Sequence, residues 1–187
     1  MSTLKVAIYP ADHTQGDEHA GCTLVEYGDY ECPHCGHAYS IVKLIQKHFG
    51  KRLRFVFRNF PLNESHPHAE SAAESAEFAG AHGKFWEMHD LLFATQSKLT
   101  RDDLIAKAQQ LNLDVARFTK DLDTHRFKPQ VESDRQEGNR LGVDGTPFFF
   151  INGHAISGGA DLPSFKHLID AALKDTAPAP AKPETAR

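Results

Sequence analysis

The sequence predicts an α/β fold in which one mixed sheet carries a large helical insertion. Residues 23–60 have the pattern of strand, helix and strand, which is a βαβ segment. Residues 64–141 contain no convincing strand pattern, and strand signals return only at 147–151, before a turn and a closing helix. The βαβ and ββα segments can combine into one sheet, which the helices between them would cap.

The composition is that of a globular domain and argues against several classes of function. The chain has 187 residues, 40% of them apolar and 25% charged, with a net charge of −4. No basic block is interleaved with aromatic residues, so we expect no nucleic-acid partner. No window of 18 apolar residues indicates a membrane span. The N-terminus lacks a signal-peptide pattern, which predicts a cytoplasmic protein, or a periplasmic one if the native N-terminus is missing.

The first outer segment, residues 1–62, contains the predicted βαβ unit. Residues 23–29 are apolar and β-prone, and they end in Gly-Asp. From Pro33 onward the apolar residues follow helical spacing until Gly50 ends the helix. Residues 52–60 then form the second strand, which runs parallel to the first.

The insertion, residues 63–141, is predicted to contain five helices. Thr100 and Asp103 form a capping-box pattern before the third of them. Asp114 can cap the fourth.

The second outer segment, residues 142–174, supplies the rest of the sheet. It holds the strand at 147–151, an Asn-Gly hairpin turn and a helix over 161–173 with Asp161 as its N-cap. Residues 175–187 are rich in Pro and Ala and are predicted to be a disordered tail.

Two cysteines, Cys32 and Cys35, follow the first strand, and Pro33 between them suits the first helical position. The Cys32 sulfur therefore faces the free N–H groups and the positive dipole end of the helix, which favour thiolate over thiol. His34, if protonated, would add to this effect. Cys35 is one turn further along and more buried, and it can attack a mixed disulfide at Cys32 and release the partner.

A second feature is the Thr146-Pro147 dipeptide, which follows a glycine and leads into the strand at 147–151. A proline in this position is a candidate for a cis peptide bond. Such a loop leaves the Thr146 backbone free to pair with an extended peptide beside Cys32. We therefore predict that Pro33, Thr146 and Pro147 contact the substrate.

The chain resembles the DsbA-type thioredoxin-fold oxidoreductases over residues 4–174. The resemblance rests on C-P-H-C after an apolar strand, G-T-P before a later strand and the helical insertion between them, with stretches such as FVFRNFPL and GVDGTPFFFING. The wider pattern is similar to a bacterial subgroup that often lacks a signal peptide. The resemblance implies a thioredoxin fold, a nucleophilic Cys32, a resolving Cys35 and a cis Pro147. It also implies a buried acid at Glu26, which can accept the proton of Cys35.

These features predict a thiol–disulfide oxidoreductase whose redox group is the Cys32–Cys35 pair, with no dissociable cofactor and no metal. Its partners would be protein or peptide disulfides and dithiols. Glutathione fits as a co-substrate, and glutathione or a thioredoxin-type protein fits as the recycling partner. The net direction, whether oxidation, reduction or isomerisation, stays open. A kappa-type glutathione-dependent isomerase or transferase is a rival, but such enzymes typically have a serine or a lone cysteine at the nucleophile.

The other rival is a redox-inert, zinc-holding binding module. His19, Cys22, Cys32 and Cys35 have ligand-like spacing. A strand over 23–28 would, however, separate Cys22 from Cys32 by about 20 Å at roughly 3.3 Å per residue, whereas zinc ligands lie about 2.3 Å from the ion. We therefore expect Cys22 to be a buried or half-buried thiol at a strand start.

Several histidines lie at or beyond the edge of the cysteine motif. His66 and His68 form an H-x-H pattern that also fits a metal site, but they precede a helix and are expected to be surface imidazoles. His37 lies one turn from His34 and can tune Cys32, contact a partner or be solvated.

Overall fold

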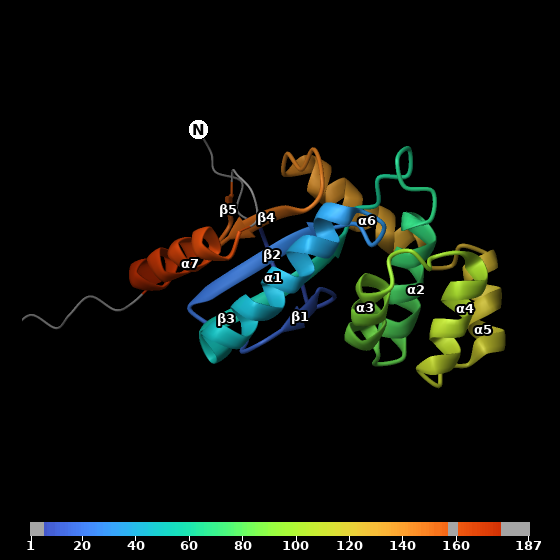
Figure 1. The fold of residues 1–187 in the computed structure, drawn as a ribbon. Coiled ribbons are helices and arrows are strands. Elements are labelled where there is room, and N and C mark those ends of the chain that lie inside the picture. Colours follow the sequence, from blue (N-terminus) through green and yellow to red (C-terminus); the bar gives the residue numbers. More distant parts are fainter. Residues whose placement is uncertain (1–5, 157–160, 177–187) are drawn as a thin grey trace, which may run out of the picture.

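The structure is a computed structural model that describes residues 6–156 and 161–176 (Figure 1). In this part of the chain five strands form one mixed sheet in the order β1-β3-β2-β4-β5. β2 and β3 run parallel, and the other neighbouring pairs run antiparallel. The strands are β1 (His13–Gln15), β2 (Cys22–Gly28), β3 (Leu53–Asn59), β4 (Phe148–Ile151) and β5 (His154–Ala155). The βαβ and ββα segments thus share a single sheet, which confirms the predicted fold class.

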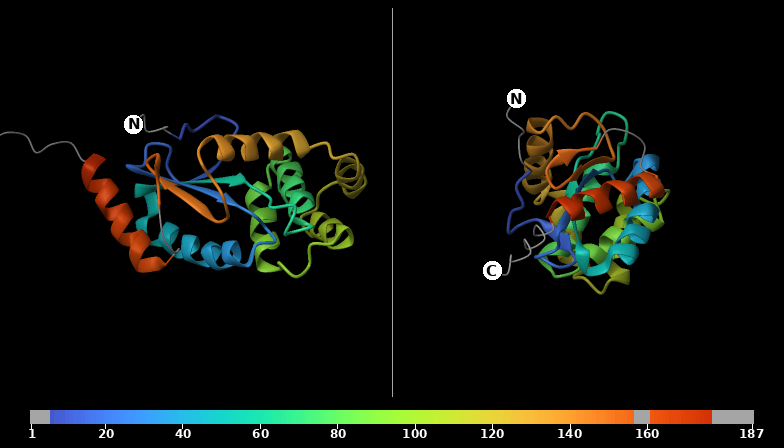
Figure 2. Two further views of the ribbon diagram at one scale, coloured as in Figure 1. Left: turned by 90° about the horizontal axis from the view of Figure 1, so that it is seen from above. Right: turned by 90° about the vertical axis from the view of Figure 1, so that its left-hand side faces the viewer.

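Helices cover both faces of this sheet and one of its ends. α1 (Pro33–Phe49) and α7 (Leu162–Thr176) lie on one face and α6 (Lys128–Arg140) on the other, as the view from above in Figure 2 shows. The other helices gather beyond one end of the sheet (Figure 1). They are α2 (Ala69–Ala81), α3 (Phe85–Ala94), α4 (Arg101–Gln110) and α5 (Val115–Asp123), and a short 3-10 helix, η1 (Gly50–Arg52), joins α1 to β3. The five predicted helices of the insertion, α2 to α6, are confirmed.

Most helices begin where the local sequence signals place them. Thr100 and Asp103 form a reciprocal capping box at the start of α4. Asp114 and Asp161 each accept a hydrogen bond from the backbone N–H three residues later, at 3.0 and 2.9 Å. None of the helices in the described residues is both long and apolar enough to cross a membrane.

Two segments differ from the prediction. β1 has three residues and no alternating apolar pattern, and it forms because the outer edge of β3 offers unpaired backbone groups, with Thr14 opposite Val56. α7 runs to Thr176 and so takes up the first two residues of the predicted tail. Residues 157–160 and 177–187 lie outside the described part of the chain.

β3 is largely buried on both faces, although two of the residues that alternate with its apolar positions, Arg54 and Arg58, are basic. Leu53, Phe55 and Phe57 pack into the larger core on the α1 face. Val56 and Arg58 on the opposite face are also buried, because α6 and the N-terminal segment cover that face. A smaller core lies there, formed by Val25, Tyr27, Val56, Phe60, Val143 and Phe150.

β2 is divided between the two cores in the same way. Cys22 and Leu24 belong to the larger core, whereas Val25 and Tyr27 belong to the smaller one. Because side chains alternate along a strand, Glu26 shares the face of Cys22 and Leu24, beneath α1. The strand therefore delivers a carboxyl group to the underside of the helix that carries both motif cysteines.

A buried ion pair holds the N-terminal segment against β3. The Arg58 guanidinium donates to both carboxylate oxygens of Asp12 at 2.8 Å, to the Tyr27 hydroxyl at 2.8 Å and to the Ala7 carbonyl at 2.6 Å. Burial opposes the charge of Arg58, but the Asp12 hydrogen bonds raise its pKa above the ordinary value. The charge of Arg58 thus depends on its carboxylate partner.

We expect the substitution Asp12→Asn to lower the free energy of unfolding by about 3–5 kcal/mol, because it leaves the Arg58 charge buried without its counter-ion. Equilibrium urea unfolding at neutral pH measures this loss. Asp123→Asn is the matched control, since Asp123 also holds an arginine with two hydrogen bonds, but at an exposed site. Its effect should be much smaller, and equal losses in the two variants would contradict the role given to the buried pair.

Candidate active site

Cys32 is the N-cap residue of α1, and Pro33 occupies the first turn. No side chain caps this helix, and its first turn contains no acidic residue, so the free N–H groups are left to the Cys32 sulfur. Both motif cysteines are free thiols, Cys32 with 3% of its surface exposed and Cys35 with none. The structure thus places them at the strand–helix junction, as the sequence predicts.

The environment of Cys32 favours its thiolate. A hydrogen bond from the Cys35 thiol, helped by the backbone N–H groups of Cys35 and His34, lowers the pKa of Cys32 to about 5 against the opposing effect of burial. His34 acts here through its backbone, and its ring is exposed. The effect of a protonated His34 ring stays a prediction.

The environment of Cys35 has the opposite effect. Burial, followed by its hydrogen bond to Cys32 and the charge of Glu26, raises the pKa of the Cys35 thiol far above its ordinary value. The backbone N–H of Asp29 donates to the Cys35 sulfur at 3.4 Å. Cys35 therefore remains a thiol and can donate a hydrogen bond to the Cys32 thiolate.

Glu26 is 2% exposed and lies close enough to both cysteines for their charges to interact. Burial and, to a lesser extent, the Cys32 charge raise the pKa of Glu26 to about 8. Its Oε1 atom is buried and has no hydrogen-bond partner among residues 6–156 and 161–176. The arrangement gives the site a proton carrier that titrates near neutral pH.

Asp29 is a site residue that the sequence reasoning missed. Its carboxylate is fully buried and accepts four hydrogen bonds: Oδ1 from the N–H groups of Glu31 at 2.8 Å and Cys32 at 3.2 Å, Oδ2 from the Leu62 N–H at 2.9 Å and from His66 Nδ1 at 2.7 Å. An aspartate two and three residues before those N–H groups is a signal for such a turn. The expectation that His66 is a plain surface imidazole is wrong, because its ring is 19% exposed and paired with Asp29.

The loop before β4 meets the cysteine motif. The Thr146–Pro147 peptide bond is cis. The Cys32 thiol lies 3.6 Å from the Thr146 carbonyl oxygen, although 114 residues separate them in the sequence. The fold thus brings together the two motifs that the sequence singled out.

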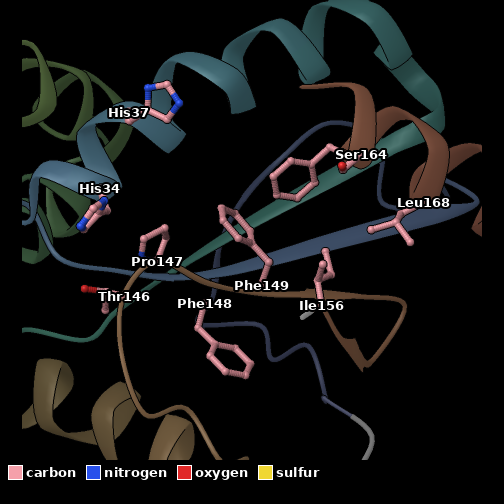
Figure 3. Close-up of a pocket in the computed structure, with 10 residues that line it drawn as sticks. His34, His37, Thr146, Pro147, Phe148, Phe149, Ile156, Ser164 and Leu168 are labelled. Atoms are coloured by element: carbon pink, nitrogen blue, oxygen red, sulfur yellow. The ribbon is translucent and has the colours of Figure 1, made fainter. Parts of the chain in front are cut away.

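A pocket of about 250 Å³ opens beside this contact, between α1, β4 and α7. Figure 3 shows His34 and His37 on α1 to one side and Pro147 across from His34. The pocket is lined by His34, His37, Thr146, Pro147, Phe148, Phe149, Ile156, Ser164, Phe165 and Leu168. Pro33 is exposed but does not belong to this lining.

The described residues do not bring the suggested zinc ligands together. Within 6–156 and 161–176, the one group of three or more His, Cys, Asp or Glu with metal-binding spacing is Glu70, Glu74 and His125 in the insertion. Cys22 lies at the start of β2 with its side chain buried, as expected, and burial raises its pKa to about 11, which disfavours a thiolate ligand.

Comparisons with known proteins show the family to which this chain belongs. A family model described as Thioredoxin matches residues 9–171. A Na(+)/H(+) antiporter NhaA 1 from Salinispora arenicola is 41% identical over 165 residues, which are 88% of this chain and 25% of that protein. A Na(+)/H(+) antiporter NhaA from Herminiimonas arsenicoxydans is 39% identical over 165 residues, which are 88% and 26%. The chain spans about a quarter of the length of these curated relatives.

Solved structures share the whole architecture. Oxidised BdbD from Bacillus subtilis has a TM-score of 0.80 and 28% identity, and the match covers 86% of this chain and 92% of that chain. The alpha-DsbA1 protein of Wolbachia pipientis has a TM-score of 0.76 and 21% identity, covering 90% and 94%. The catalytic domain of ScsC from Proteus mirabilis has a TM-score of 0.74 and 17% identity, covering 88% and 90%. The chain therefore belongs to the thioredoxin family and has the fold of its DsbA-like members.

Proposed function

We propose that this protein is a thiol–disulfide oxidoreductase that acts through Cys32 and Cys35. The observation that carries the proposal is the opposite effect of the site on the two thiols, with the pKa of Cys32 lowered to about 5 and that of Cys35 raised. A thiolate at neutral pH is the reactive nucleophile in disulfide exchange, and a neighbouring thiol can resolve the intermediate.

In the reducing direction, the Cys32 thiolate attacks one sulfur of a substrate disulfide. A mixed disulfide forms, and the other substrate sulfur leaves as a thiolate. Cys35 then loses its proton and attacks the Cys32 sulfur, which forms the Cys32–Cys35 disulfide and releases the second substrate thiolate. Two electrons pass from the pair to the substrate, and the reverse sequence oxidises a dithiol.

Glu26 is proposed as the acceptor of the Cys35 proton. While Cys32 is a thiolate, its charge helps to keep the pKa of Glu26 raised. Formation of the mixed disulfide removes that charge, so Glu26 becomes a carboxylate more readily at the moment when Cys35 must lose its proton. The timing of the proton transfer would thus follow from the charge on Cys32 itself.

The proposed substrates are protein or peptide disulfides and dithiols, bound in extended form beside Cys32. The Thr146 backbone would pair with such a chain, and the pocket between α1 and α7 would take an apolar side chain next to the reacting cysteine. No dissociable cofactor is required. Glutathione or a thioredoxin-type protein would restore the pair.

The compartment would decide the net direction. A low pKa of Cys32 stabilises the reduced form and makes the disulfide oxidising. In the cytoplasm, which we propose as the location, a glutathione buffer keeps such a pair mostly reduced, which suits reduction, isomerisation or removal of glutathione from proteins. In an oxidising compartment such as the periplasm, the same pair would oxidise dithiols.

Equilibration with reduced and oxidised glutathione tests the proposal. We expect a reversible two-electron couple in the wild type, no couple in Cys32→Ser, and a trapped mixed disulfide in Cys35→Ser, because the resolving thiol is gone. Mass spectrometry of alkylated protein measures each state. Cys22→Ser is the matched control and should keep the couple. Stoichiometric zinc with unreactive thiols in the wild type, or glutathione binding without dithiol turnover, would instead support the rival functions.

We expect Glu26→Gln to change the pH dependence of stability in the reduced protein, because it removes the contribution of this one carboxyl group. In the unfolded chain Glu26 ionises at a pH of roughly 4.3. In the folded state its pKa is raised to about 8, so it stays protonated between these two pH values. At this group the folded state then binds more protons, so the contribution of Glu26 to stability falls as the pH rises from 4.5 to 8. Relative to wild type, the variant should gain about 2 kcal/mol or more at pH 8 and little at pH 4.5.

Urea unfolding at pH 4.5, 6 and 8 measures this difference. Glu87→Gln, at an exposed position on α3, is the control and should leave the profile of the wild type unchanged. A gain in Glu26→Gln that is the same at all three pH values would contradict a buried, protonated Glu26.

A further inference from the structure

The His66 ring lies in the loop between β3 and α2, against the base of the cysteine loop. Its Nδ1 atom is 2.7 Å from Asp29 Oδ2. The His66 side chain is 19% exposed, whereas the Asp29 side chain is fully buried. A proton on this ring can therefore exchange with solvent, while the carboxylate that it faces cannot be hydrated.

Asp29 contacts both motif cysteines as well as His66. Its Oδ1 accepts from the Cys32 N–H at 3.2 Å, and its backbone N–H donates to the Cys35 sulfur at 3.4 Å. The carboxylate thus lies at the N-terminus of α1, beside the place where the Cys32 thiolate forms. Two negative charges at one helix end disfavour each other unless a cation compensates them.

The groups around the His66 ring are mainly acidic. Three of them act on it from the cysteine loop: Asp29, Cys32 and Glu31, the last of which is paired with His68 at 2.9 Å. Burial opposes a charged ring, but the Asp29 hydrogen bond and the charges of Asp29, Cys32 and Glu31 raise the pKa of His66 above its ordinary value. On its own loop, the Glu64 carboxylate is exposed.

We infer that His66 is a positioning residue that takes up a proton when the Cys32–Cys35 pair is reduced, and that its charge, acting through Asp29, stabilises the Cys32 thiolate. The inference rests on the proposed function, since it assigns a redox-linked proton to the same site. Coupling of this kind is reciprocal. The Cys32 thiolate raises the proton affinity of His66 by a certain factor. Protonated His66 must lower the proton affinity of Cys32 by the same factor.

The proton balance of the reaction accommodates this step. Two glutathione thiols that reduce the disulfide become glutathione disulfide and give up two electrons and two protons. One proton ends on Cys35, and Cys32 remains a thiolate. The second proton is then free to bind His66 or to enter solvent, and the fraction that His66 takes depends on pH. Reduction therefore releases one proton where His66 takes none, and less than one where His66 takes part of it. Rising pH should accordingly favour reduction less steeply within the titration range of His66 than outside it.

The direct test is the titration of His66 in the wild-type protein, followed by NMR of its ring resonances. We expect a higher pKa in the reduced form than in the disulfide form, by about threefold to tenfold in the proton-binding constant. Cys32→Ser, which removes the thiolate, should titrate like the disulfide form. Identical His66 titrations in the reduced and disulfide forms would overturn the inference.

The second test uses His66→Asn, because the asparagine amide keeps a donor for Asp29 but cannot carry a charge. Thiolate absorbance should show a Cys32 acid dissociation constant weakened by about threefold to tenfold, and the glutathione equilibrium should shift toward the disulfide by a similar factor. His82→Asn is the control, since this exposed histidine donates to a backbone carbonyl at the far end of α2. An unchanged Cys32 titration in His66→Asn would overturn the inference.

The two proposals fail in different ways. A reversible glutathione couple with no change at His66 leaves the proposed function in place and removes the role of His66. The opposite result is a protein that shows no glutathione redox couple but whose His66 titration differs between the wild-type dithiol and Cys32→Ser. It would overturn the proposed function and leave the electrostatic interaction between His66 and Cys32 in place.

Discussion

The uncapped N-terminus of α1 is the constraint on which the rest of the site depends. A helix leaves its first N–H groups without partners, and a serine or aspartate side chain usually satisfies one of them. Here the N-cap residue is Cys32 and the first turn contains no acid, so the N–H groups of His34 and Cys35 act on the Cys32 sulfur. The Cys32 sulfur accepts from these otherwise unpaired N–H groups. Because a thiolate is a better acceptor than a thiol, the helix end favours the thiolate. Asp29 holds the preceding loop from below and keeps the Cys32 sulfur at the helix end.

Burial then gives chemically identical side chains different roles. Cys22, Cys32 and Cys35 are all nearly inaccessible. Only Cys32 has its pKa lowered, because hydrogen bonds to its sulfur outweigh desolvation. Burial raises the pKa of Cys22, which behaves as a small apolar residue in the core. Burial also raises the pKa of Glu26, whose Oε1 atom has no hydrogen-bond partner among the described residues, so this carboxyl group favours its neutral form. The fold thus sets reactivity by where it places each donor.

Local signals made much of the fold predictable. Pro33 and Gly50 bound α1, the Thr100–Asp103 capping box begins α4, and the Asn-Gly turn joins β4 to β5. Each of these signals acts within a few residues. The pairs Arg58–Asp12 and His66–Asp29 are different, because their members lie 46 and 37 positions apart in the sequence. No local pattern encodes such pairs. Cys32 and Cys35 were found from spacing and helix position, whereas Glu26 was found only through the family resemblance. The chemical roles of these residues stay predictions.

The pairing of β2 has a consequence for the order in which the protein is built. This central strand is hydrogen-bonded to β3 on one side, close in sequence, and to β4 on the other, which follows the entire insertion. During synthesis the cysteine motif therefore leaves the ribosome long before the loop at Thr146 that contacts it. Such long-range pairing is slow to form, because a large loop must close first. A nascent chain would therefore expose both thiols before the Thr146 loop lies beside them. Selectivity among partners would arise only when the hairpin of β4 and β5 pairs with β2.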